Sequence, residues 1–177
     1  DVNINARERR EMEHAARLLL ESGVTVDVAY TSKLKRAIRS TWVLLREIDQ
    51  IYRPVLKSWR LNERMYGALT GLSKDGLAAE IGARPVQAWR HSLNARPPPL
   101  SPDHPLAPHR ERKYADVPRA ELPTSESLQD CLERALPLWH ERVAPDLRAG
   151  RNVLVVAHGN SLRGLVKAID DVDPIEI

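Results

Sequence analysis

Apolar residues at helical spacing open the chain. Five of them recur at intervals of one to four positions and share one face of a helix. They are Met12, Ala15, Ala16, Leu19 and Leu20. Asn5 is a suitable N-cap, Glu8 stands at the capping-box position, and Gly23 is a natural C-terminal stop. The pattern predicts a helix over about residues 6–22.

A strand and a second helix are predicted next. Alternating apolar residues within 24–30 are typical of a short strand. A second apolar helical face follows, with Thr31 or Ser32 as the expected cap. Its members are Leu34, Ala37, Ile38, Thr41, Leu45 and Ile48. A further short extended segment is expected near Val55.

The C-terminal part repeats this alternation. A long helix is expected from Thr124 or Ser125, and Pro137 should kink or break it. The continuous apolar run 153–157 is typical of a strand buried on both faces. A last helix follows, with four apolar residues expected to face inward. They are Leu162, Leu165, Val166 and Ile169. Alternating helices and strands with a doubly buried strand predict an α/β sandwich.

The middle of the chain is less regular. Periodicity is poor over 59–71, and short helices are plausible near 74–82 and 84–92. Residues 97–123 hold eight of the thirteen prolines, so this segment cannot form long regular elements. Two interpretations stay open: a mobile surface excursion, or an insertion that borders a functional site.

Composition narrows the class of protein. Hydrophobic residues make up 42% and charged residues 29%, as in a soluble globular domain. No apolar run is long enough to cross a bilayer. The single cysteine, Cys131, excludes an internal disulfide and predicts a reducing compartment, most simply the cytoplasm. A net charge of +3 suits nucleic acid, an acidic membrane surface or a small anionic substrate.

Candidate chemistry lies where the apolar run 153–157 ends. His158, Gly159 and Asn160 join this expected strand to the last helix. Ligands of open α/β sheets bind at the carboxyl ends of strands, and a helix N-terminus favours an anion. His158 could donate a hydrogen bond to a phosphoryl oxygen there. The alternative is that His158 is only a polar residue of a turn.

A cluster of cations opens the second helix. Lys33, Lys35 and Arg39 are interpreted as a solvated basic face. Arg36 is the better functional candidate, because a guanidinium suits bidentate binding of phosphate. Further along, Glu63 lies among several basic residues. It could act as a general acid or base, or it could be a structural ion-pair partner. Before any resemblance is considered, the ion-pair role is favoured.

Several segments together resemble one enzyme family. Its T-S-x-L-x-R-A segment is similar to residues 31–38, Thr-Ser-Lys-Leu-Lys-Arg-Ala-Ile. Its S-W-R-L-N-E-R-H-Y-G-A-L-x-G-L block closely resembles residues 58–72, Ser-Trp-Arg-Leu-Asn-Glu-Arg-Met-Tyr-Gly-Ala-Leu-Thr-Gly-Leu. The family is the cofactor-dependent phosphoglycerate mutases. Matches at 89–90, 97–99, 114–116, 126–128 and 157–161 follow in the family's order. The resemblance covers essentially the whole chain, and the long block is its most specific part.

The resemblance implies a fold and an activity. The fold is a three-layer α/β/α sandwich of the phosphoglycerate-mutase type. The activity is interconversion of 3- and 2-phosphoglycerate in glycolysis and gluconeogenesis through a phosphohistidine, with 2,3-bisphosphoglycerate as phosphoryl donor and no metal. Phosphoglycerates are the implied partners, and a homo-oligomer is expected without nucleic acid or membrane.

The resemblance also implies roles for individual residues. Glu63 and His158 would be catalytic, Glu63 as proton donor and acceptor for the substrate hydroxyl. The remaining implied substrate contacts are Arg36, Tyr66, Lys74, Arg90, His91, Gly159 and Asn160. Fixed cations and hydrogen-bond donors around a transferring phosphoryl group are what its transition state requires.

Departures from the family pattern qualify this interpretation. The nucleophilic histidine of the family's L-x-R-H-G segment is absent from residues 1–177, as are the first strand and the C-terminal tail. We therefore expect a single domain over 1–177, shortened at both ends, with 97–123 as a proline-rich loop insertion, and no turnover without the upstream histidine. Met65 stands where the family has histidine, and His91 where it has a second arginine.

Three alternatives remain at this point. A bisphosphoglycerate mutase would share the same site residues. A non-catalytic family member that binds anions is favoured by the missing nucleophile. A nucleic-acid-binding protein is disfavoured, because the basic residues fall at separate motif positions and form no stripe with interleaved aromatic residues.

Overall fold

The computed structural model describes residues 1–72, 88–89 and 92–170. The chain forms two compact units. The first comprises Asp1–Asn62 and Ala135–Leu162, and the second comprises Glu63–Arg134 and Arg163–Ile177. Each unit is described by itself.

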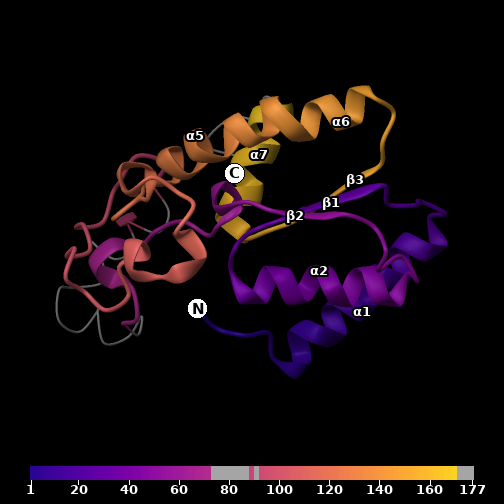
Figure 1. The fold of residues 1–177 in the computed structure, drawn as a ribbon, viewed down its shortest axis with the longest axis horizontal. Helices are drawn as coiled ribbons and strands as arrows, with labels where there is room; N and C mark the ends of the chain where they lie inside the picture. Colours follow the sequence, from indigo (N-terminus) through magenta and orange to yellow (C-terminus); the bar gives the residue numbers. More distant parts are fainter. Residues whose placement is uncertain (73–87, 90–91, 171–177) are drawn as a thin grey trace. The chain divides into compact units, whose positions relative to one another are not determined.

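A parallel three-stranded sheet lies in the first unit (Figure 1). Its strands are β1 (Val28–Thr31), β2 (Val55–Lys57) and β3 (Val153–Val156). β1 is central, with Thr31 opposite Lys57 of β2 and Val156 of β3. The order β2-β1-β3 brings the carboxyl ends of all three strands to one edge of the sheet, where ligands of such folds bind.

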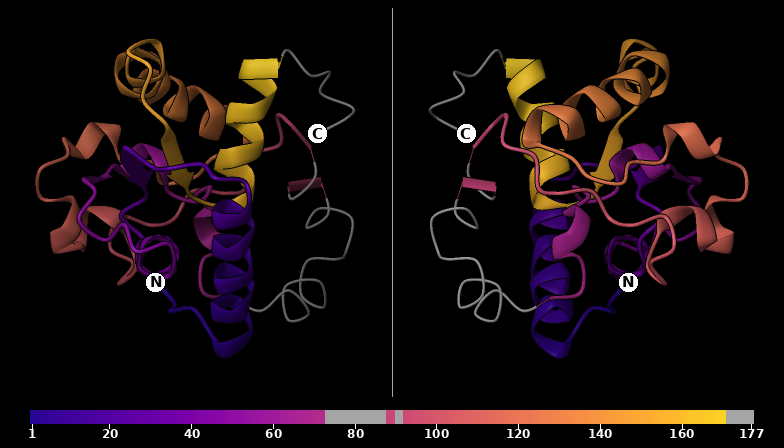
Figure 2. Two further views of the ribbon diagram at one scale, coloured as in Figure 1. Left: turned by 90° about the vertical axis from the view of Figure 1, so that its right-hand side faces the viewer. Right: turned by 90° about the vertical axis from the view of Figure 1, so that its left-hand side faces the viewer.

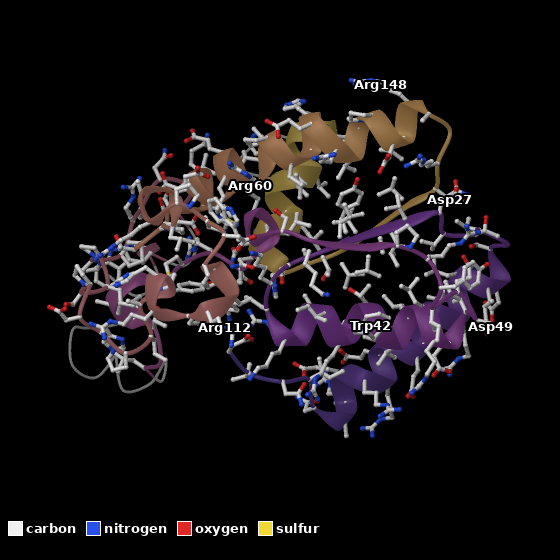
Figure 3. All side chains as sticks on the ribbon, viewed as in Figure 1. Asp27, Trp42, Asp49, Arg60, Arg112 and Arg148 are labelled. Atoms are coloured by element: carbon white, nitrogen blue, oxygen red, sulfur yellow. The ribbon has the colours of Figure 1, made fainter. Side chains whose placement is uncertain are left out.

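Helices α1 (Ala6–Glu21) and α2 (Lys35–Glu47) cover one side of this sheet. The predicted capping box of α1 is present, with Asn5 and Glu8 bonded reciprocally. Side chains fill the space between α2 and the strands (Figure 3). The buried members of this core are Ala16, Val26, Ala29, Leu44, Leu45 and Ile48. The amphipathic pattern of the sequence therefore directs both helices onto the sheet as expected.

Helix α6 (Ala144–Arg148) lies on the opposite side of the sheet, as the views at right angles also show (Figure 2). It follows α5 (Leu128–Leu138) and a π-helical turn at Trp139–Val143. Pro137 lies at the end of α5, so the predicted break is confirmed and takes the form of this turn. Helix, sheet and helix give the predicted α/β/α layering.

Two sequence expectations about strand and helix ends were wrong. Thr31 belongs to β1 and Ser32 accepts a bond from the Leu34 backbone N–H, so α2 begins at Lys35 without a side-chain cap. Similarly, α5 begins after Ser127, whose side chain and backbone bond Asp130. The contacts at both helix starts are local: Ser32 bonds two residues ahead, and Ser127 and Asp130 bond each other three residues apart.

Strand β3 is less buried than its apolar sequence predicts. All four of its residues are only partly buried, because β3 is an edge strand in the part of the chain that the structure describes. A groove of about 600 Å³ runs beside it. Apolar residues dominate its lining, notably Leu18 and Leu19 of α1, Leu44 of α2 and Leu154 of β3.

The second unit contains the proline-rich segment. Short 3₁₀ turns at Pro108–Arg110, Arg112–Tyr114 and Arg119–Glu121 replace regular helices, as the prolines predict. The segment still contributes buried side chains: Leu100, Ala107, Tyr114 and Leu122. It therefore packs into the protein, which disfavours a mobile surface excursion, and its place beside a functional site stays a prediction.

Helix α7 (Gly159–Asp170) follows β3 directly. Leu165 is buried as predicted, whereas Val166 and Ile169 are exposed, so the inward face of this helix is narrower than its sequence suggested. No helix among the described residues is long and apolar enough to cross a membrane.

A hydrogen bond between the sheet and α6 gives a pH-dependent contribution to stability. The Tyr30 hydroxyl donates to Asp146 at 2.6 Å, and burial, together with this bond, raises the pKa of Tyr30 to about 12. Because the folded pKa exceeds the unfolded value of about 10, this contribution is complete below about pH 10 and is lost as pH rises toward 12. The thermal midpoint of the wild type should therefore fall faster than that of Tyr30→Phe over this interval. Parallel pH curves for the two proteins would contradict the assignment.

Candidate active site

A buried hydrogen-bonded chain lies at the carboxyl edge of the sheet. Because Thr31 and Val156 are paired, the residues that follow them leave the sheet side by side. There Ser32 Oγ lies 2.8 Å from His158 Nε2, and Arg36 Nε donates to His158 Nδ1 at 3.1 Å. Arg60 lies toward this carboxyl end and Asp27 toward the other (Figure 3). The structure thus brings Arg36 and His158 together, as the sequence predicted.

These contacts define the protonation of His158. A guanidinium only donates, so Nδ1 of His158 accepts the Arg36 bond and carries no proton. Nε2 then carries the proton of the neutral ring and donates to Ser32 Oγ. Ser32 is therefore not a serine nucleophile activated by histidine. Such a pair needs an accepting Nε2 and a carboxylate on the other nitrogen, where this site has Arg36.

The surroundings of His158 suit an anion. Helix α7 begins at Gly159, so its N-terminal N–H groups and dipole point toward this edge. A Cβ built on Gly159 would meet no atom within 4 Å, which leaves space for a ligand to approach the backbone. Asn160 lies in the same first turn. Arg36 is only partly buried, and its terminal Nη groups make no hydrogen bond within the described part of the chain.

The solvated basic face expected for Lys33, Lys35 and Arg39 is seen for the last two, whereas Lys33 is partly buried. Lys35 and Arg39 are exposed. The Lys35 backbone N–H is bonded by the Asp1 carboxylate, and that of Lys33 by Asn62. These contacts organise the loop before α2.

The second unit holds the segment that resembles the mutase block. Glu63 accepts a bond from the backbone N–H of Arg64 at 2.7 Å, so its carboxylate turns back over its own segment. The Arg64 guanidinium lies over the Tyr66 ring, 4.6 Å from its centre. Met65 stands between these residues and is bonded on both backbone groups by Glu126.

Arg64 is a candidate that the sequence interpretation missed. Its side chain is only 2% exposed, yet Nε and Nη1 have no hydrogen-bond partner among the described residues. Its Nη2 donates to the Trp89 backbone carbonyl at 2.5 Å. A buried cation with unpaired N–H groups is costly unless an anion or a polar group pairs with it. No motif could signal this, because burial of an arginine is a tertiary property.

Gly67 closes this segment in a conformation that only glycine adopts easily. Its φ is +59°, and a Cβ built on it would lie 2.1 Å from the Pro98 carbonyl oxygen. That carbonyl also accepts the Ala68 N–H. Gly67→Ala should therefore lower the free energy of unfolding by at least about 2 kcal/mol, from backbone strain and the displaced bond together.

Chemical denaturation of Gly67→Ala measures this loss. Gly23→Ala is the matched control, because Gly23 also has a positive φ but nothing lies within 4 Å of its built Cβ. Equal losses in the two variants would show that the close approach to Pro98 contributes nothing.

Other candidate chemistry is limited. Burial raises the pKa of the Cys131 thiol to about 12, so it stays protonated and is a poor nucleophile. Within the described ranges, no three His, Cys, Asp or Glu side chains are grouped to hold a metal ion. Lys74, Arg90 and His91 lie outside the described residues. Glu63 and Tyr66 belong to the other compact unit from Arg36 and His158, so their convergence stays a prediction.

Comparison with known proteins decides the family. The model of the histidine phosphatase superfamily, branch 1, matches residues 1–177. The chain belongs to this superfamily. This membership confirms the coarser part of the sequence prediction, an enzyme of phosphoryl transfer. It does not distinguish a mutase from a phosphatase.

Solved structures agree on the fold of this superfamily member. A mycobacterial hydrolase has a TM-score of 0.70 at 22% identity, and the match covers 98% of this chain and 70% of that one. The complex of a mycobacterial glucosyl-3-phosphoglycerate phosphatase with inorganic phosphate has a TM-score of 0.67 at 25% identity, covering 98% and 72%. A phosphoglycerate mutase from Bacillus anthracis str. Sterne has a TM-score of 0.65 at 18% identity, covering 97% and 70%. These relatives include both reaction types.

Proposed function

We propose that this protein is a cofactor-dependent phosphoglycerate mutase, which interconverts 3- and 2-phosphoglycerate in the cytoplasm. The block at residues 58–72 carries the proposal, because it matches the mutase pattern nearly without interruption. The contact of Arg36 with His158 at the carboxyl edge of the sheet supports it.

The residues of this chain would have distinct tasks. Arg36, through its Nη groups, would hold the phosphoryl oxygens, aided by the first turn of α7 at Gly159 and Asn160. His158, whose two ring nitrogens are bonded to Arg36 and Ser32, would orient the Arg36 guanidinium and would donate to a phosphoryl oxygen only when the ligand displaces Ser32 from Nε2. Glu63 would take and return the proton of the substrate hydroxyl. The nucleophile would be a histidine upstream of Asp1. Tyr66, Lys74, Arg90 and His91 are proposed substrate contacts on the resemblance alone.

The anionic donor implied by the resemblance fits one observation of this structure. The buried guanidinium of Arg64 presents Nε and Nη1 without a partner among the described residues. A phosphate or carboxylate oxygen would satisfy both groups. Arg64 is thus a proposed residue for one end of a 2,3-bisphosphoglycerate, whose chemistry is to supply the phosphoryl group.

A phosphatase is the second candidate function. The glucosyl-3-phosphoglycerate phosphatase that shares this fold at 25% identity favours it. Both reactions require residues that bind the oxygens of the phosphoryl group. They differ in the acceptor of that group, which is a sugar-acid hydroxyl in the mutase and water in the phosphatase. Proton transfer by Glu63 serves either reaction.

The experiment follows isomerisation and phosphate release in parallel. The full-length protein that contains these residues is incubated with 3-phosphoglycerate and catalytic amounts of 2,3-bisphosphoglycerate. We expect 2-phosphoglycerate to form much faster than inorganic phosphate, and only when the donor is present. Phosphate released as fast as the substrate disappears would establish the phosphatase instead. Residues 1–177 alone should show neither activity.

A further inference from the structure

A buried ion pair lies behind the segment Glu63–Gly67. Glu126 and Arg134 are 3% and 8% exposed. They meet in a two-point contact, Arg134 Nε to Glu126 Oε1 at 2.6 Å and Nη2 to Oε2 at 3.0 Å. Burial lowers the pKa of Arg134, but Glu126 together with Cys131 and Glu63 outweighs this effect and raises that pKa above its ordinary value. The guanidinium and the carboxylate thus face each other as a buried two-point ion pair.

Glu126 also holds Met65 at two points. Its Oε2 accepts the Met65 N–H at 2.8 Å, and its own backbone N–H donates to the Met65 carbonyl at 2.8 Å. Met65 lies between Arg64 and Tyr66 and is the second residue after Glu63. A carboxylate fixed on one side by Arg134 thus fixes the backbone of the candidate catalytic segment on the other.

The position of Glu126 is itself rigid. Ser127, which follows Glu126 directly, and Asp130 bond each other at the start of α5. Arg134 lies on α5, and its Nη2 also lies 3.3 Å from Cys131 Sγ. Arg134 thus anchors the ion pair to α5. Glu126 in turn anchors the segment Glu63–Gly67 to the ion pair.

We propose that Glu126 and Arg134 are positioning residues, which hold the segment Glu63–Gly67 in the conformation that phosphoryl transfer uses. The proposal rests on the proposed function, in that Glu63 acts on the substrate. It goes beyond a stabilising role, because the Glu126 oxygen that Arg134 fixes is the acceptor of the Met65 N–H.

The double variant Glu126→Met/Arg134→Met separates positioning from stability. Apolar replacement of both partners of a buried pair is often neutral or stabilising, whereas removal of one partner is strongly destabilising. We expect Glu126→Met alone to lower the thermal midpoint by roughly 10 °C and the double variant to recover most of that loss. Turnover should stay reduced about 100-fold in both, since neither retains the acceptor for Met65 and small displacements of catalytic groups have effects of this size.

Turnover is measured on the full-length protein with 3-phosphoglycerate and with a generic phosphomonoester. The loss should appear in kcat more than in KM, because Glu63 is proposed to act in the chemical step. Arg96→Ala is the matched control: it removes a two-point contact with Asp130 in the same unit, but Arg96 is exposed and does not bond the segment. It should change turnover less than 2-fold. A double variant that recovers both thermal midpoint and turnover would overturn the proposal.

Amide hydrogen exchange supplies a readout that does not depend on activity or on either variant folding. In the wild-type protein the Met65 amide should exchange as slowly as amides of the helix that begins at Leu128, whereas an amide that exchanges as fast as one exposed to solvent would overturn the proposal. If the double variant folds, Met65 should lose protection selectively. A wild-type protein inactive on both substrates would refute the proposed function, and the Met65 exchange would still decide whether the pair holds the segment.

Discussion

Arg36→Ala should reduce kcat/KM for phosphoryl transfer by about 10²–10³-fold in the full-length protein, the usual effect of removing one fixed donor from a developing oxyanion. Arg36 contacts His158 through Nε, and no hydrogen bond of its Nη groups lies within the described residues. Arg36→Lys should recover only part of the loss, because an ammonium keeps the charge and loses the planar two-point contact.

The matched control for this prediction is Arg39→Ala. Arg39 lies on the same helix and carries the same charge, but it is exposed. Its replacement should change kcat/KM by less than about 3-fold, through long-range electrostatics alone. Calorimetric titration with vanadate or inorganic phosphate should show the same ranking. Equal effects of the two replacements would mean that net charge on α2, and not the contact with His158, binds the anion.

The second large effect concerns the open side of β3. Residues 1–177 expressed by themselves should be poorly folded or aggregate, because the described β3 has a neighbour on one side only and borders an apolar groove of about 600 Å³. Each unpaired buried backbone group costs about 1–3 kcal/mol, and a whole domain is stable by only about 5–15 kcal/mol. A few such groups and the uncovered apolar surface are enough to exhaust that margin.

Sedimentation and thermal unfolding test this prediction. Leu18→Glu, in the groove, should reduce aggregation, because Leu18 is 52% exposed there. Leu147→Glu is the control, since Leu147 is similarly exposed at 44% but does not line the groove. A monomeric 1–177 with a cooperative transition at an ordinary mesophile temperature would defeat the prediction.

The roles of Glu63 and Tyr66 show how far the sequence reaches. The contiguous block at residues 58–72 identified the segment that contains Glu63 and Tyr66. The sequence also showed that Met65 and His91 differ from the family pattern. What the sequence left undecided was whether Glu63 is an acid or base or an ion-pair partner. In the structure the buried ion pair nearby is made by Glu126 with Arg134. This pair does not involve Glu63, so both interpretations of Glu63 stay open.

The sequence by itself predicted the helices at 6–21 and 35–47, the break at Pro137, the α/β class and the motif segments. Each of these depends on neighbours within a few positions: the spacing on α1, the Asn5 capping box, the break at Pro137. Local geometry fixes them before the chain has packed.

Only the tertiary structure decided the protonation of His158, the burial of Arg64 and the hold of Glu126 on Met65. The partners in these contacts are separated by 122 positions for Arg36 and His158 and by 61 for Met65 and Glu126. The same is true of Ser32, which a local pattern assigned to a helix cap and which bonds His158 instead. Hydrogen-bond partners and burial follow from which surfaces pack together, and no local pattern of residues contains that information.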